Sequence, residues 1–487
     1  MGVVLLVGLY TTRVVLQVLG VEDYGVYNVI GGFVSMFGVL NTSLSGGINR
    51  FFNYYIGKND SKGITTVYNT SLQIQLIMTL FVLVLVETVG LWYLNNKIVL
   101  PEARMQDAHI LFQCSVFSLV LMLLQAPYNA AITAYERMGF YAFISIVDVV
   151  LKLVIVFLLQ VTSHDKLLFY GLLMTVVSVV NFFMNYIYCK RNFADLKIRR
   201  GFNRTEFKAM VSFSGWSLLD PLSYMVRGQG CNMVLNYFFG PIINAAYSIA
   251  NQIAVSLDSF SMNLTVAFRP QIIQSYSAGD FVKSTSLVFS MSRIMFMLNL
   301  VLFLPVIFEI NYILSLWLGS TFPSAATSFT LLILILKLIT VFNPPLTNLM
   351  SAVGKIKAIM LCSFITICSI LPLSILFFKQ GAIPEYMYYL MIALALINQI
   401  VSSVIVAKQF SFFNLLKYLK QVILPCSVLS IIVMIPMLIV NHLFEESLVR
   451  VILSFLISFS FTLVFGFFIV LEPGERLRIK SALHRNR

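Results

Sequence analysis

Charged residues are scarce in this sequence. Of its 487 residues, 33 are lysine or arginine and 20 are aspartate or glutamate, so that 11% are charged, while 59% are hydrophobic. Soluble globular domains carry about 25% charged residues. The scarcity of charge excludes a soluble domain, and the abundance of apolar residues excludes a disordered chain.

Cysteine and histidine are also few and scattered. The six cysteines lie in or beside apolar segments and form no CxxC pair, and the four histidines lie singly near loops or in the tail. This pattern predicts core cysteines and neither a disulfide framework nor a metal site, and we expect no cofactor. The sequence contains no phosphate-binding loop and no paired-carboxylate motif, so neither ATP hydrolysis nor glycosyl transfer is indicated.

Long apolar stretches, by contrast, recur along the whole chain. Each has about the 20 residues that cross a ~30 Å hydrocarbon core as a helix. The first begins at Met1 without a charged leader, so we interpret it as a helix and not as a signal peptide. The expected helices number fourteen: 2–19, 25–46, 65–94, 109–128, 140–160, 167–189, 209–238, 241–268, 284–309, 325–350, 357–378, 386–407, 421–441 and 448–471. The predicted fold class is therefore an all-α polytopic membrane protein.

The basic residues of the loops fall mainly on one side of this topology. Alternate loops carry 23 lysines and arginines on one side and 5 on the other. Because basic residues accumulate in cytoplasmic loops, we expect both termini in the cytoplasm and a multi-pass protein of the cell membrane. The net charge of +13 is explained in this way, and no nucleic-acid partner is expected.

Two passages about 220 residues apart resemble each other. Gly20 and Asp60 correspond to Gly240 and Asp280, and the segment 127–137 matches 345–355 at an offset of 218. Six helices per repeat give both halves the same orientation, as in transporters built from parallel repeats. We predict an N-lobe over residues 1–200, a C-lobe over 201–410, and two further helices with a basic cytoplasmic tail over 411–487. The two lobes are expected to enclose a cavity.

The runs that mark these repeats carry a family resemblance. The segment 19–29, LGVEDYGVYNV, continues to Arg50-Phe51-Phe52 and to Gly57-Lys58-Asn59-Asp60, and a similar run extends from Ala245 to Asp280. Over essentially the whole chain the sequence resembles the polysaccharide-biosynthesis, or O-antigen (Wzx-type), flippases. Their superfamily, the multidrug/oligosaccharidyl-lipid/polysaccharide exporters, also contains the multidrug and toxic-compound extruders. The resemblance implies a MATE-like fold and a lipid-linked oligosaccharide as substrate.

Several charged residues lie inside the expected helices. A cation at a lipid-facing helix centre costs about 2.5–3.5 kcal/mol, so these residues cannot all face lipid. The spacing of Asp148 and Lys152 favours a structural ion pair. The predicted substrate-binding cations are Arg227, Arg13, Arg293 and Lys337. For Arg293 and Lys337, pairing with neighbouring helices or snorkelling is an equal alternative.

Helix 7 is predicted to be broken, both at Asp220-Pro221 and at Gly228-Gln229-Gly230. Irregular backbone at membrane depth is tolerated where it lines a cavity, and a glycine-rich packing kink is the alternative. A polar stripe follows on helix 8. It suits either a hydrated cavity or close helix packing. The predicted polar cavity residues are Asp220, Gln252, Ser256 and Asn263.

Taken together, the sequence favours a flippase that moves an isoprenoid-pyrophosphate-linked oligosaccharide to the outer leaflet by alternating access, and not an enzyme. An exporter of organic cations is the alternative in the same superfamily, although its cavity should be acidic. A membrane glycosyltransferase or polymerase is less consistent, since the outer loops are short and their acids isolated. The expected partners are the lipid-linked oligosaccharide, membrane lipids, and polymerase or assembly proteins of the same polysaccharide.

Overall fold

The computed structural model describes residues 11, 14–15, 18–19, 23, 27, 30–31, 34, 37–96, 104–162, 165–199, 201–318 and 323–476. All regular elements in this part of the chain are helices, and it contains no strand. It divides into two compact units, Met1–Pro221 and Leu222–Arg487. Arg13 and the tail beyond residue 476 lie outside the described residues.

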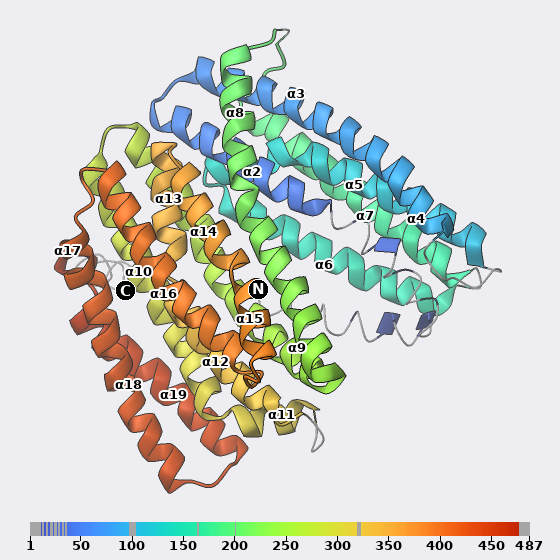
Figure 1. Ribbon diagram of the computed structural model, residues 1–487. Coiled ribbons are helices and arrows are strands. Elements are labelled where there is room, and N and C mark those ends of the chain that lie inside the picture. The colour runs from blue at the N-terminus through green and yellow to red at the C-terminus, as the bar shows by residue number, and fades with distance from the viewer. Residues whose placement is uncertain are drawn as a thin grey trace. The chain divides into compact units, whose positions relative to one another are not determined.

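The first unit contains the helices drawn in blue to green in Figure 1. They are α2 (Gly38–Gly57), α3 (Ser61–Leu85) with η1 (Val86–Gly90) and α4 (Leu91–Asn96), α5 (Met105–Ala134), α6 (Met138–Val161), α7 (Lys166–Asn192) and α8 (Arg204–Ser217). Helix α5 packs against both α2 and α7, and α8 packs against α2 and α3. Apolar residues of α3, α5, α6 and α7 form the core of this unit.

The second unit begins within α9 (Leu219–Ser277). It continues through α10 (Phe281–Phe308), α11 (Ile310–Leu318), α12 (Ala325–Thr340), α13 (Asn343–Val353), α14 (Lys357–Cys368), α15 (Ile370–Lys379), α16 (Tyr386–Gln409), α17 (Leu415–Tyr418) with η3 (Leu419–Ile423), α18 (Leu424–Leu443) and α19 (Leu448–Phe465) with η4 (Gly466–Val470). Its core is built from α9 to α12, α15 and α16.

Ten helices of the described chain are long and apolar enough to span a membrane. Their most apolar windows have mean hydropathies of 1.9 to 2.7. The protein is thus an all-α, multi-pass membrane protein, as predicted. Helix α9 joins two of the expected helices across Gly240, whose φ of 79° and ψ of −175° break the helical backbone.

The internal repeat is visible in the backbone at the matched positions. Asp60 and Asp280, 220 residues apart, both cap the N-terminus of a helix, α3 and α10, with the side chain accepting backbone N–H bonds. Each follows a residue of positive φ, Asn59 at 54° and Gly279 at 84°. The other matched passage likewise ends on positive φ, at Glu136 and Gly354, 218 residues apart. Matched residues therefore make matching turns.

Helix α2 extends much further than the predicted helix 25–46, which placed Arg50 in a loop. The structure continues the helix to Gly57. Its extra turns bury Phe52 completely and leave Phe51 6% exposed. The packing of these two side chains stabilises the helix beyond its predicted end, although polar residues flank them. Arg50 lies over the rings of Phe51 and Phe213, at 4.6 and 5.2 Å from their centroids. Such cation–π contacts explain why a charged residue is tolerated here.

The predicted break in helix 7 is present at only one of its two positions. Helix α8 ends at Ser217 and α9 starts at Leu219, with Pro221 in its first turn, where the missing N–H costs little. Gly228, Gln229 and Gly230 are helical, so the prediction of a second break was wrong. A Cβ at Gly230 would lie 2.4 Å from Leu371 Cδ1, which shows that this glycine serves close packing against α15.

The last two helices, α18 and α19, belong to the second unit. They pack on each other and on α10, and Figure 1 shows them in red beside one another. A buried ion pair fastens α19 to the C-terminal end of α10. Near the end of α10, Arg450 Nε donates to Glu309 Oε2 at 2.9 Å, and Ser454 donates to the other carboxylate oxygen at 2.9 Å.

Candidate functional site

A cavity of about 540 Å³ lies within the first unit. This volume falls within the ~300–1,000 Å³ of typical ligand pockets. Its walls come from α5, α6 and α7 and from Tyr27, Gly31 and Val34. The polar residues of the wall are Tyr27, Ser115, Ser118, Gln125, Ser145, Asp148, Thr175, Ser178 and Asn181.

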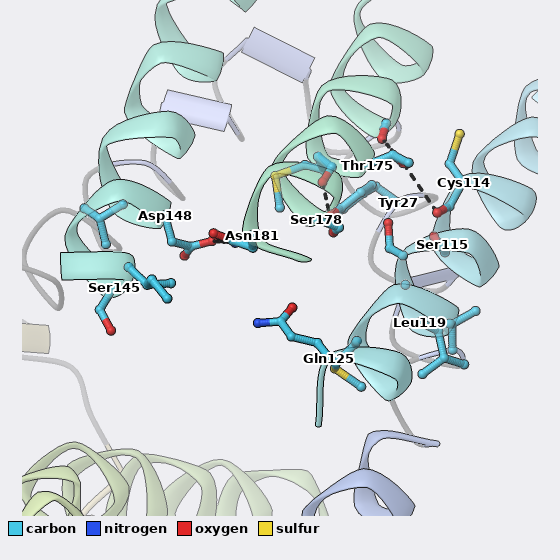
Figure 2. A pocket seen from close by; sticks show the side chains of 18 residues that line it. Tyr27, Cys114, Ser115, Leu119, Gln125, Ser145, Asp148, Thr175, Ser178 and Asn181 are labelled. Carbon is cyan, nitrogen blue, oxygen red and sulfur yellow. Dashed lines mark hydrogen bonds between the residues drawn. The ribbon is translucent and has the colours of Figure 1, made fainter. Parts of the chain in front are cut away.

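Helical spacing brings these polar groups to one place. On α7, Thr175, Ser178 and Asn181 follow one another at intervals of three, and Ser115, Ser118 and Gln125 recur on one face of α5. Figure 2 shows the Gln125 amide across the open space from Asp148 and Asn181. Ser178 donates to the backbone oxygen of Met174 at 3.2 Å, and Thr175 to that of Gly171 at 2.9 Å.

Asp148 is the carboxylate of this cavity, and its charge is compensated. Lys152 Nζ lies 2.7 Å from Oδ2, which confirms the predicted ion pair. Asn181 Nδ2 donates to the other oxygen, Oδ1, at 2.8 Å. The Asn181 Oδ1 atom is buried and accepts no hydrogen bond within the described part of the chain. The cavity therefore offers hydroxyl and amide groups, the carboxylate of Asp148 paired with Lys152, and Asn181 Oδ1 as a further hydrogen-bond acceptor.

Of the predicted cations, Arg227 lies on α9 in the second unit and is half-buried. Its guanidinium carbon lies 4.9 Å from the ring centroid of Tyr224, one turn earlier. The ring of Tyr224 thus covers one side of this cation.

Arg293 is not in the cavity. It is fully buried in α10, with Nη1 3.0 Å from Glu472 and Nη2 2.9 Å from Glu475. Ser290 also donates to Glu475. Burial alone would raise the pKa of the Glu475 carboxyl, but the bonds from Ser290 and the Glu472 N–H and the charge of Arg293 lower it overall. In this conformation Arg293 fastens the chain after α19 to α10.

Lys337, on α12, is ion-paired with Asp258 on α9. This contact corresponds to the pairing alternative weighed from the sequence. The binding of substrate by Arg293 and by Lys337 stays a prediction.

The polar stripe of α9 is partly exposed on the second unit. Ser256 donates to the backbone oxygen of Gln252 at 2.8 Å, and Asn263 donates to that of Ser259 at 2.8 Å. Since these donors are satisfied within their own helix, the stripe can border either water or other helices. Asp220 lies in the first turn of α9, in the first unit.

Comparison with known proteins shows which structures share this architecture. A family model described as MatE matches residues 217–376. A structure entitled an outward-facing multidrug resistance MATE family transporter of the MOP superfamily aligns with a TM-score of 0.73 and 15% identity, covering 85% of this chain and 94% of that one. The chain has the MATE fold. No curated protein matches the sequence.

Two other structures with the MATE fold show the same degree of likeness. A MOP superfamily transporter from Pyrococcus furiosus Vc1, whose title reports a binding pocket of reverse polarity, has a TM-score of 0.68 and 14% identity, with 84% and 94% of the two chains covered. A MATE protein in complex with MaL6 has a TM-score of 0.67 and 14% identity, with 84% and 95% covered. At these sequence identities the matches show a shared fold and do not identify the substrate.

The cavity of the first unit was missed as a site from the sequence, although its central ion pair was predicted. Asp148 and Lys152 are four residues apart, whereas Asn181 is 33 residues from Asp148 and Gln125 lies on a third helix. The available signal was the recurrence of serine, threonine and asparagine at intervals of three along α7. Only the packing of α5, α6 and α7 joins these groups into one wall.

Proposed function

We propose that this protein is a flippase of the cell membrane that moves an isoprenoid-pyrophosphate-linked oligosaccharide from the cytoplasmic to the outer leaflet. The observation that carries the proposal is the composition of the cavity in the first unit. Its polar wall is made of hydroxyl and amide groups, and its carboxylate is neutralised by Lys152. Such a wall suits the many hydroxyls of a sugar, each of which both donates and accepts hydrogen bonds.

A cationic substrate would require a different wall. A carboxylate attracts an organic cation when its charge is uncompensated, and aromatic faces add cation–π attraction. Here the carboxylate is paired, and Tyr27 is the one aromatic residue among the 18 that line the cavity. The pyrophosphate of the proposed substrate carries negative charge, for which Arg227 in the second unit is the proposed partner. Alternating access is the proposed mechanism.

Export of organic cations is the second candidate. Its support is the fold, since a structure entitled a multidrug resistance MATE transporter shares it over 85% of this chain. On this reading the Asp148–Lys152 pair would have to open so that Asp148 could bind the cation. The two candidates therefore make opposite predictions for Lys152.

A deletion strain complemented with variants tests the proposal. If the protein is a flippase, the deletion loses surface polysaccharide, accumulates the lipid-linked repeat unit on the cytoplasmic leaflet, and keeps its resistance to cationic dyes. Lys152→Met, which leaves Asp148 unpaired in the cavity, should impair glycan export, whereas in a cation exporter it should preserve or raise dye export. Lys166→Met, at an exposed lysine outside the cavity, is the matched control.

Arg227→Ala should abolish export at normal protein level, and Arg227→Lys should keep part of it if charge is what matters. Full activity of Arg227→Ala would remove this residue from the site. A deletion strain that keeps its glycan and becomes sensitive to dyes would establish the exporter. A lipid-linked unit that is never completed would instead indicate an enzyme.

A further inference from the structure

The connector between α7 and α8, residues 193–203, is bound along helix α3. Three α3 side chains at intervals of four, Thr65, Asn69 and Gln73, donate to the backbone oxygens of Asp195, Lys197 and Gly201 at 2.8, 2.8 and 2.7 Å. The Arg199 N–H returns a bond to Asn69 Oδ1 at 2.7 Å. Because side chains four apart share one face of a helix, the connector follows that face in an extended path.

The connector ends where the lipid-facing surface of α3 begins. Large exposed apolar side chains on α3 start at Leu76, three residues after Gln73. The helical run that α3 opens, Ser61–Asn96, has 36 residues, or about 54 Å of helix, whereas the hydrocarbon core is only ~30 Å thick. The first turns of α3 and the connector bound to them therefore lie at the depth of the lipid headgroups.

The outward side chains of this segment are basic and apolar. Among the described residues, the exposed basic side chains of the segment and the adjoining helix ends are Lys190, Arg191, Lys197, Arg199, Arg204 and Lys208. Two large apolar side chains stand out beside them, Ile198 at 74% and Phe202 at 59% exposure. The two acids of the region are turned to the protein, since Tyr135 donates to Asp195 at 3.0 Å and Tyr55 donates to Glu206.

We propose that the connector is a membrane-surface segment that binds anionic phospholipid headgroups of the cytoplasmic leaflet. The basic side chains supply the charge complementarity, and Ile198 and Phe202 enter the boundary between headgroups and acyl chains. The hydrogen bonds to α3 hold these groups in place in advance, so that little ordering is needed on binding. This inference is independent of the transported substrate; its assignment to the cytoplasmic leaflet uses the topology predicted from the loop charges.

The test uses the full-length protein, free of native cysteines and carrying bimane on Phe202→Cys, in vesicles of phosphatidylcholine with brominated lipid. Brominated phosphatidylglycerol should quench the label more strongly than brominated phosphatidylcholine, and the two quenching curves give a relative binding constant. Each basic residue near the surface is worth about fivefold in affinity for anionic lipid. The double variant Lys197→Glu/Arg199→Glu should therefore lower the preference at least tenfold, or to none.

The matched control is Lys166→Glu/Lys379→Glu, which reverses two exposed lysines in other loops and should leave the preference unchanged. Equal quenching by both lipids in the unaltered segment would overturn the proposal, as would a preference that survives the double reversal. Absence of quenching by either lipid would also overturn it, and would point to an acidic protein in the aqueous phase as the occupant. Every variant shares the cysteine-free background, and the other substituted side chains are exposed, so a difference between variants should not reflect a loss of fold.

Discussion

At the scale of single residues, intramembrane charge in this protein is neutralised largely through contacts between helices. The Asp148–Lys152 pair could be predicted because both residues lie on one helix, four positions apart. Arg293 and Glu472 are separated by 179 residues, and Lys337 and Asp258 by 79. No local spacing indicates such partners, because only the packing of helices decides which charges meet.

Arg293→Met should destabilise the second unit. The substitution leaves Glu472 and Glu475 without their cation, and removing one member of a buried pair costs about 3–5 kcal/mol. Because Glu472 is 38% exposed, we expect a free energy of unfolding lowered by about 3 kcal/mol, at the low end of that range. It is measured as a reduced thermal midpoint in detergent, with the exposed Lys379→Met as control.

Two further measurements separate the ion pair from a mere packing effect. Adding Glu472→Gln and Glu475→Gln to Arg293→Met should restore part of the lost stability. Since the folded-state pKa of Glu475 is lowered, its contribution is present above the ordinary glutamate pKa of about 4.3 and is lost as the pH falls below it. If Arg293→Met were as stable as the parent protein at pH 7, the ion pairs of Arg293 with Glu472 and Glu475 would contribute nothing to stability.

At the scale of helices, the sequence predicted the existence of the elements better than their ends. Apolar runs identify each span, but α2 continues for eleven residues beyond its predicted end at residue 46 because Phe51 and Phe52 pack into the unit. The glycines of helix 7 show the same limit. Gly228 and Gly230 look alike in sequence, yet the structure gives only Gly230 a close neighbour.

Gly230→Val and Gly228→Val should therefore differ in their effects. A side chain at residue 230 meets Leu371 Cδ1 at 2.4 Å and Cδ2 at 2.9 Å, and overpacking of this kind costs about 1–3 kcal/mol. Apart from the backbone of its own helix turn, no atom of the described residues lies within 4 Å of a Cβ at residue 228, so the same substitution there should be nearly neutral. Thermal unfolding in detergent measures both variants. Leu371→Ala should rescue Gly230→Val, and equal losses at both glycines would contradict the packing explanation.

At the scale of the whole molecule, the repeat was the most productive sequence signal. It paired Asp60 with Asp280, and both cap a helix in the structure. The compact units of the structure are Met1–Pro221 and Leu222–Arg487, and the two lobes over residues 1–200 and 201–410 stay a prediction. The connector is tied to α3 by hydrogen bonds that involve its own backbone, and composition carries no information about such bonds.

The orientation of the chain in the membrane is a prediction of loop charge, and cysteine labelling tests it across the whole molecule. In a background without native cysteines, Lys197→Cys and Lys408→Cys should react only with reagent that reaches the cytoplasm, and Lys166→Cys and Lys379→Cys with reagent added outside. All four lysines are exposed, so access to reagent does not depend on opening the fold. The expectation follows from the 23 to 5 asymmetry, because translocating basic loops against the membrane potential is unfavourable.

Labelling of Lys197→Cys and Lys408→Cys from opposite sides would require an odd number of spans between them and would contradict the parallel repeat. Labelling of both from outside would preserve the repeat but invert the protein, and would move the connector to the outer leaflet.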